Sequence, residues 1–163
     1  MIEGTVHRFG DDIDTDMLAP GAYMKGPVET LARHCLEAVD PDFVRRVAPG
    51  DIVVAGDNFG LGSSREQAVS ALLLNGVAAV LATSFARIFY RNALNLGLPA
   101  LVCPSARDIP AGTRLRLDPA AGWAEDAAGR RHACEPIPPH LMAMIADGGL
   151  LPHLEKTRKA KTS

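Results

Sequence analysis

The central third of the chain alternates short apolar runs with helical segments, and this pattern limits the possible folds more than any other feature of the sequence. The apolar runs predict three buried strands, and each helical segment between them ends at a glycine, a common helix stop. The predicted elements are, in chain order, strand 52–55, helix 64–75, strand 77–81, helix 85–96 and strand 98–102. Because parallel strands need crossover connections, the alternation predicts parallel strands joined by right-handed crossover helices.

Smaller elements are expected on both sides of this core. On the N-terminal side they are a strand over 3–9, a long acidic loop over 10–23, an amphipathic helix from Pro27 and a second helical start at Asp40. On the C-terminal side they are a strand over 113–117 that pairs with 129–133 as a hairpin, a last helix from Pro138 and a frayed tail over 156–163. The predicted fold class is therefore α/β, with small antiparallel strands beside a parallel centre.

Length and charge narrow the choice of function. The 163 residues fit one domain spanning 1–163, and 47% hydrophobic residues exclude a disordered chain. The net charge of -2 lacks the basic excess that nucleic-acid binding uses, so no nucleic-acid partner is expected. No apolar run reaches the roughly 20 residues that cross a membrane, and the first ten residues lack a signal peptide's apolar core. We expect a cytoplasmic protein with no membrane association.

The cysteines and histidines do not form a recognisable metal motif. Cys35, Cys103 and Cys134 lie too far apart for a Cys-x-x-Cys knuckle or an iron–sulfur ligand run. The five histidines also lack ligand spacing. We therefore expect buried, reduced thiols, no metal site and no cofactor bound by this chain alone.

The segment from Gly56 to Glu66 carries the clearest chemical signal. It leaves a predicted buried strand, contains three glycines and enters a predicted helix whose first N–H groups attract anions. Asn58 adds a polar side chain, and Gly62 allows a ligand to approach the backbone closely. Arg65 adds a guanidinium cation, whose fork geometry suits a carboxylate. These features predict a carboxylate pocket beside Ser63 and Ser64, whose donors could also stabilise a serine alkoxide.

The segment from Gly56 to Glu66 does not match three other motifs that a glycine-rich loop can suggest. Ser63 follows Gly62 where a Walker loop needs lysine, and Arg65 stands where a dinucleotide fingerprint needs its third glycine. Neither serine sits in a Gly-x-Ser-x-Gly nucleophile elbow. One plainer alternative stays open, in which the two serines only cap the start of a helix. The spacing of a helix capping box is present in Ser63 with Glu66 and in Ser64 with Gln67.

Three motifs taken together resemble a known family. They are Asp14-Thr15-Asp16, the run from Gly56 to Glu66, and Ser84 to Asn92 followed by Gly97-Leu98-Pro99. In this combination the chain resembles the small subunits of 3-isopropylmalate dehydratases, the separate-chain form of the aconitase swivel domain. The resemblance covers roughly residues 4–102, with looser agreement to the end.

The resemblance implies a swivelling β/β/α domain that docks on a large subunit carrying a [4Fe-4S] cluster, with the active site between the two. It implies Ser63 as the catalytic base and Ser64 and Arg65 as substrate-binding residues. The implied reaction is dehydration and rehydration of a small hydroxy-dicarboxylic or tricarboxylic acid. In the family the Asp14-Thr15-Asp16 motif supports the loop that follows it.

That following loop is implied to select the substrate's side group, and here it contains Tyr23, Met24 and Lys25. Met24 could suit an alkyl group and Lys25 an extra carboxylate, so isopropylmalate, homoaconitate, citramalate and dimethylmalate stay open. Tyr23 and Met24 could equally be core or interface filler.

Two function hypotheses follow. In the first, the chain is the small subunit of a hydro-lyase acting on 3-isopropylmalate in leucine biosynthesis, inactive without its large subunit. In the second, it is a carboxylate-binding regulatory domain without catalysis. Whether the isolated chain forms a homo-oligomer stays open.

Overall fold

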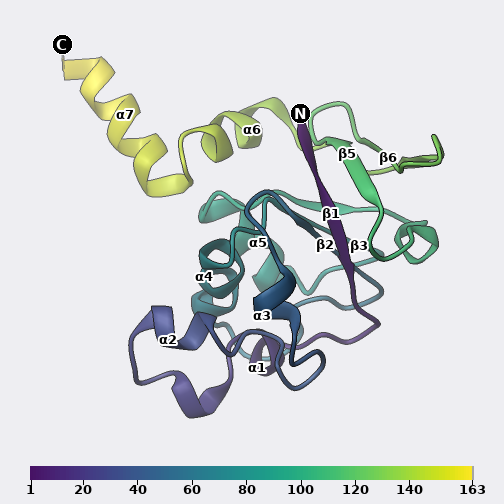
Figure 1. Cartoon of the computed structure of the whole chain (residues 1–163). Helices are drawn as coiled ribbons and strands as arrows, with labels where there is room; N and C mark the ends of the chain where they lie inside the picture. The colour runs from purple at the N-terminus through teal and green to yellow at the C-terminus, as the bar shows by residue number, and fades with distance from the viewer. Residues whose placement is uncertain (163) are drawn as a thin grey trace.

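The computed structural model describes residues 1–162, and the side chains of residues 1–160, as a mixed α/β structure built on one sheet (Figure 1). Its seven strands lie in the order β4-β3-β2-β1-β5-β6-β7. The strands are β1 (Ile2–Arg8), β2 (Ile52–Ala55), β3 (Ala79–Ala82), β4 (Ala100–Val102), β5 (Arg114–Asp118), β6 (Trp123–Glu125) and β7 (Arg131–Ala133). Strands β1 to β4 pair in parallel, whereas β5, β6 and β7 pair antiparallel beyond β1.

The helices lie between and after these strands. They are α1 (Thr15–Leu18), α2 (Val28–Ala32), α3 (Phe43–Arg46), α4 (Glu66–Leu74), α5 (Arg87–Asn95), α6 (Pro139–Ala146) and α7 (Leu150–Thr162), with short 3-10 turns η1 (Gly21–Tyr23) and η2 (Ala106–Asp108). Helices α4 and α5 are the crossovers from β2 to β3 and from β3 to β4, and α7 projects away from the body of the molecule (Figure 1). The predicted α/β class, with parallel centre and antiparallel flank, is confirmed.

The central strands are buried on both faces, which explains why they read as continuous apolar runs. Val53 and Val80 point into a core that the crossover helices cover, where Leu72 of α4 and Phe89 of α5 pack. The alternate residues of the same strands belong to a second core, together with Leu115 and Leu117 of β5 and Met144 of α6. The sheet therefore separates two apolar layers.

The two ends of the sheet meet, although β4 and β7 are farthest apart in strand order. The backbone N–H of Glu135, just after β7, donates a hydrogen bond of 2.8 Å to the carbonyl of Val102 in β4. The twist that strands share lets a sheet curl in this way. Segments far apart in the sequence, around residues 103 and 134, consequently lie side by side.

Several predicted boundaries are wrong. Strand β6 was not predicted, and it takes the place of 129–133 as the partner of β5, while β7 pairs with β6. The acidic loop contains α1, whose start Asp14 caps by accepting a hydrogen bond from the Met17 N–H. The predicted last helix is followed by a further one, α7, which runs to Thr162, and Ser163 lies outside the described residues.

Candidate functional site

Polar side chains gather where the parallel strands end. Arg107, after β4, donates to Asp11 after β1 at 2.6 Å and to Asp57 after β2 at 3.0 Å. The Asp57 backbone N–H donates to Asp11 at 2.8 Å. That hydrogen bond, together with the Arg107 guanidinium, keeps the pKa of Asp11 below its usual value. This edge is where open α/β sheets usually bind ligands.

Phe59 fixes the loop that follows β2. Its ring is fully buried and packs edge-on against the rings of Phe85 and Phe89. Its backbone N–H donates to the Ser84 carbonyl, and its own carbonyl accepts from the Ala86 N–H, both at 3.0 Å. An apolar side chain in the core thereby holds a polar loop against the start of α5.

The glycines of this loop have the backbone conformations that the sequence pattern requires. Gly60 has φ +84° and Gly62 has φ +114°, both in the left-handed region. A Cβ on Gly60 would lie 2.2 Å from the Phe89 ring. The Gly60 N–H donates to the Ile13 carbonyl at 2.6 Å, so the loop also lies against the acidic segment. Glycine is thus required at Gly60 by both conformation and space.

Ser63 and Ser64 are exposed and do not cap a helix. Helix α4 begins at Glu66, its N-cap position is Arg65, and that residue makes no side-chain capping bond. The predicted start at Ser64 and the capping-box alternative are therefore wrong: the serines stand on the loop before the helix. The next helix also starts later than the predicted residue 85, since Ala86 is the N-cap of α5.

Arg65 reaches back to the acidic segment. Its Nη1 donates to Asp16 Oδ1 and to the Ala19 carbonyl, both at 3.0 Å. Asp16 also accepts from the Gly21 N–H, and these hydrogen bonds, that from Arg65 first, lower the pKa of Asp16. The predicted free two-pronged donor is thus corrected: one terminal nitrogen of Arg65 is already occupied within the chain.

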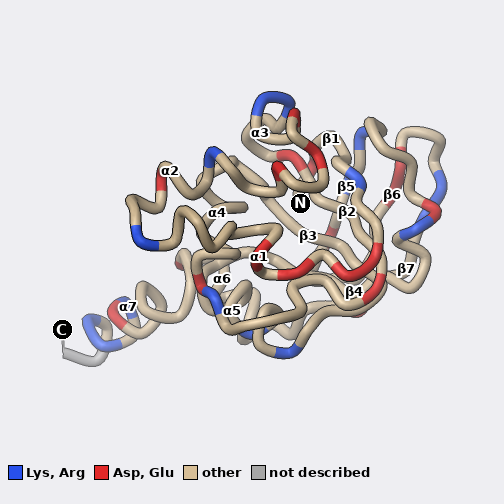
Figure 2. The backbone as a smooth tube through the Cα atoms, turned by 90° about the horizontal axis from the view of Figure 1, so that it is seen from below, with Lys and Arg blue, Asp and Glu red and all other residues tan. Residues whose placement is uncertain are grey.

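The other two residues of the predicted supporting motif lie against the same loop. Asp14 forms a backbone bridge with Leu61, and the Thr15 N–H donates to the Leu61 carbonyl at 2.9 Å. The Thr15 side chain is buried, and its hydroxyl would lie 3.0 Å from a Cβ on Gly62. Figure 2 shows acidic residues along the chain beside α1. The structure therefore brings this motif and the serine loop together.

Asn58 has partners within the chain, and so do two residues of the predicted specificity loop, Tyr23 and Met24. The Asn58 side-chain amide donates to Asp12 at 3.0 Å, and its backbone N–H donates to the Ser84 hydroxyl at 2.9 Å. Tyr23 stacks on His34 with ring centroids 3.7 Å apart, and Met24 also packs against the core. Lys25 is exposed. Tyr23 and Met24 thus pack as partly buried core residues.

Sequence reasoning missed the ionic cluster of Asp11, Asp57 and Arg107. The sequence pattern places Asp11 in the acidic loop and Asp57 in the segment from Gly56 to Glu66, and it gives no signal at Arg107. Asp57 and Arg107 follow predicted parallel strands, so the rule that ligand sites lie at the carboxyl ends of such strands could have found these two. Asp11 follows the predicted strand over 3–9, which only the structure shows to be parallel to β2.

A separate cavity of about 630 Å³ lies away from this loop. It is lined by the buried His7–Asp51 pair, joined at 2.8 Å, and by Arg8, Arg46 and Arg114 among others, and it includes no residue of the serine loop. The candidate site is the serine loop with the acidic segment that it contacts, because Ser63, Ser64 and Arg65 lie there and not in this cavity.

The cysteines do not suit an iron–sulfur cluster. Cys35 is buried in the core beneath the crossover helices, whereas Cys103 and Cys134 belong to the second core. Across the described residues, no three histidine, cysteine or acidic side chains form a metal-binding group. In the same part of the chain, no helix combines the length and apolar character needed to cross a membrane.

Comparisons with known proteins identify the family of the chain. The family model "Aconitase C-terminal domain" matches residues 16–106. A 3-isopropylmalate dehydratase small subunit of Moorella thermoacetica is 49% identical over 100% of this chain and 99% of its own length. A methanogen homoaconitase small subunit of Methanothermobacter thermautotrophicus is 45% identical over 96% of this chain and 92% of its own.

A solved structure extends the agreement to three dimensions. The crystal structure of 3-isopropylmalate dehydratase (LeuD) from Methanocaldococcus jannaschii matches with a TM-score of 0.93 and 40% identity, covering 99% of this chain and 97% of that one. The resemblance drawn from the three sequence motifs is confirmed. The chain belongs to the aconitase family, among its separate small subunits of the 3-isopropylmalate dehydratase type.

Proposed function

We propose that this chain is the small subunit of a hydro-lyase that interconverts 2-isopropylmalate and 3-isopropylmalate by dehydration and rehydration, a step of leucine biosynthesis. The full-length identity of 49% to the Moorella small subunit carries this proposal. The exposed serine loop, held by core contacts at the carboxyl ends of parallel strands, supports it.

The residues of the loop take separate roles in this proposal. Ser63 acts as the base: its side-chain oxygen, as the alkoxide, takes a proton from a substrate carbon to become the hydroxyl and returns that proton in the reverse addition. Ser64 and Arg65 bind a substrate carboxylate, with the Arg65 N–H groups not used by Asp16 or Ala19. Gly62 lets the backbone approach the substrate closely, and Asn58 orients the loop through Asp12.

The site is completed by a second protein. We propose that a large subunit docks over the serine loop and holds the [4Fe-4S] cluster, which supplies a Lewis acid for the substrate hydroxyl. Leu61 in this loop and Ile88 at the start of α5 are 38% and 49% exposed, which supports a partner covering this region. The chain acts as one domain within this complex, and we place the complex in the cytoplasm.

Substrate choice is assigned to the segment with Tyr23, Met24 and Lys25. Asp16 connects this segment to Arg65, because it accepts hydrogen bonds from both the Gly21 N–H and the guanidinium. The homoaconitase relative makes a longer tricarboxylic acid the second candidate substrate, with Lys25 as the cation for its extra carboxylate.

Co-expression with a cluster-bearing large subunit tests the proposed function. The purified complex is expected to turn over isopropylmalate with kcat/KM at least about tenfold above that for homoaconitate, citramalate or 2,3-dimethylmalate. The chain alone is expected to show no turnover. Absorbance of the unsaturated acid formed by dehydration measures both.

Three other outcomes of this experiment would contradict or change the proposed function. Turnover by the chain alone contradicts the shared active site, and homoaconitate as the fastest acid moves the assignment to that substrate. An assembled complex that binds these acids but turns over none favours the non-catalytic, carboxylate-binding alternative.

Arg65→Lys in that complex is expected to raise KM about 10- to 100-fold, because an ammonium replaces a planar fork that holds carboxylate and Asp16 together. Steady-state kinetics measure it. Arg45→Lys is the matched control, since Arg45 pairs with Asp42 on the surface at 3.5 Å and both side chains are largely exposed. An unchanged KM in Arg65→Lys contradicts the carboxylate-binding role.

A further inference from the structure

Two thiols lie where the ends of the curled sheet meet. Cys103 directly follows β4 and is fully buried, and Cys134 directly follows β7 and is 9% exposed. The backbone hydrogen bond from Glu135 to Val102 holds their two segments side by side. The cysteines are 31 positions apart in the chain, so only the closure of the sheet makes them neighbours.

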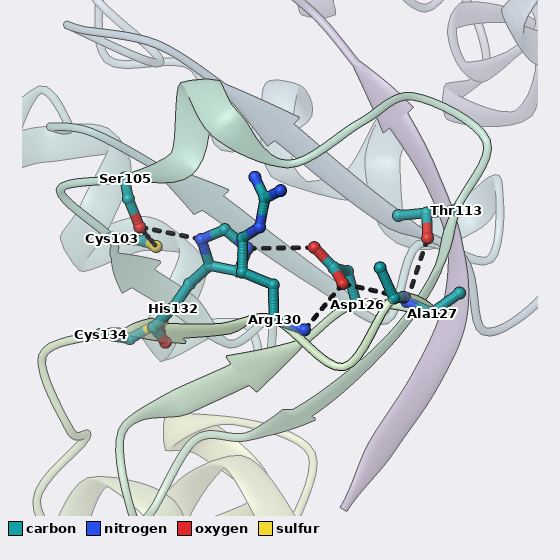
Figure 3. A network of polar contacts seen from close by, with 9 residues as sticks. Cys103, Ser105, Thr113, Asp126, Ala127, Arg130, His132 and Cys134 are labelled. Carbon is teal, nitrogen blue, oxygen red and sulfur yellow. Dashed lines mark hydrogen bonds and ion pairs between the residues drawn. The ribbon is translucent and has the colours of Figure 1, made fainter.

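The thiols lie in one buried core and approach nearby oxygens. Cys103 and Cys134 both belong to the second core, and Figure 3 shows their side chains at the same end of one polar network. The Cys103 sulfur also lies 3.9 Å from the Ser105 hydroxyl, and the Cys134 thiol donates to the His132 carbonyl at 3.7 Å. A disulfide requires the two cysteines to lie on neighbouring backbone segments, and the shared core and the hydrogen bond from Glu135 to Val102 provide this arrangement.

A buried polar chain extends from these thiols (Figure 3). His132 Nδ1 lies 2.9 Å from the Ser105 hydroxyl oxygen, and His132 Nε2 lies 3.3 Å from Asp126 Oδ2. Asp126 in turn accepts backbone hydrogen bonds from Ala128 and Arg130. The imidazole is therefore held between a carboxylate and a hydroxyl that reaches Cys103, an arrangement that can accept and pass on a thiol proton.

The two thiols are not equivalent. The neighbouring Cys134 side chain lowers the pKa of Cys103 by more than burial raises it, with further help from Ser105. The neighbouring Cys103 side chain and burial both raise the pKa of Cys134. Since the thiolate is the nucleophilic form, Cys103 is the attacking sulfur and Cys134 the resolving one.

We propose that Cys103 and Cys134 form a reversible redox site that closes to an intramolecular disulfide when a small peroxide oxidises it. The Cys103 thiolate attacks one peroxide oxygen, an S–O bond forms, the O–O bond breaks and the departing hydroxide takes a proton to become water. The Cys134 sulfur then attacks the resulting sulfenic acid, forming the S–S bond and releasing a second water. Two thiols lose two electrons and two protons in total, and one hydrogen peroxide becomes two waters.

The disulfide would link the two outer strands of the sheet covalently. Because it closes a loop in the unfolded chain, oxidation is expected to raise the melting temperature by about 5 to 10 °C. The link also restrains the segment from Cys103 to η2, in which Arg107 holds Asp11 and Asp57. The thiol pair is thus connected to the edge of the sheet that carries the candidate site.

Cys35 provides an internal control. It is as buried as Cys103, but it belongs to the other core, apart from both other thiols, and there burial raises its pKa to about 12. It should therefore stay reduced under conditions that oxidise the pair. Trypsin separates all three thiols, because its cleavage sites place Cys35 in peptide 34–45, Cys103 in peptide 92–107 and Cys134 in peptide 132–156.

The experiment treats the full-length chain with hydrogen peroxide, blocks remaining thiols with an alkylating reagent and digests without reductant. Peptides 92–107 and 132–156 are expected as one linked species, two hydrogens lighter than their sum and separated again by dithiothreitol, while peptide 34–45 is alkylated. Disulfide-linked dimers, linkage through Cys35, or irreversible oxidation of Cys103 without a link would each overturn the proposal.

Two variants complete the test. Cys134→Ser is expected to lose both the link and the thermal shift on oxidation, whereas Cys35→Ser keeps both. If Cys134→Ser fails to fold, the peptide map of the unmodified chain still decides, since free, alkylated Cys103 and Cys134 after peroxide treatment refute the site.

Discussion

Ser63→Ala in the assembled complex is expected to lower kcat by about 10²- to 10⁴-fold, the range that a positioned general base contributes. The methyl group cannot take a proton from carbon, whereas Ser64 and Arg65 remain to bind the carboxylate. KM should therefore change by less than about threefold, so that the loss lies in the chemical step. Steady-state kinetics with the reconstituted complex provide the measurement.

Because Ser63 is exposed, Ser63→Ala should remove the hydroxyl without changing the stability of the chain. Its side chain forms no helix cap, because α4 starts at Glu66, so its removal costs no capping energy. Ser70→Ala, within α4, is the matched control and should keep kcat. If Ser63→Ala assembles and turns over at the original rate, Ser63 is not the base.

Gly60→Ala is expected to destabilise the chain by about 2 to 5 kcal/mol, from left-handed backbone strain plus overpacking. Its φ is +84°, and an added Cβ would lie 2.2 Å and 2.3 Å from two Phe89 carbons in the core. The melting temperature should fall by roughly 5 to 15 °C. Urea unfolding followed by circular dichroism measures the free energy of unfolding.

This substitution also connects the core to the candidate site. Phe89 cannot move without disturbing Phe59, whose ring packs on it at 5.1 Å between centroids. A shifted Phe59 would move the serine loop, so turnover should fall together with stability. Gly10→Ala is the control, because nothing lies within 4 Å of a Cβ there, and its unfolding free energy should change by less than about 0.5 kcal/mol. Equal stability of Gly60→Ala and Gly10→Ala would show that the loop tolerates a side chain.

The apolar runs and glycine stops were sufficient to predict the parallel centre, because buried strands and helix ends are local properties of sequence. Capping was not predictable in the same way. The serines have the right spacing for a capping box, yet Phe59 enters the core and the glycines bend the loop, so the helix starts only after Arg65.

The sequence by itself determined the α/β class, the strand and helix order of the centre, and the family to which the serine loop belongs. Tertiary structure alone decided that Arg65 binds Asp16, that Arg107 joins Asp11 to Asp57, and that Cys103 and Cys134 lie in one core. The physical reason is the same in each case. The residues of these pairs are 31 to 96 positions apart, and such pairs become neighbours only through strand order and the curl of the sheet, which no local pattern encodes.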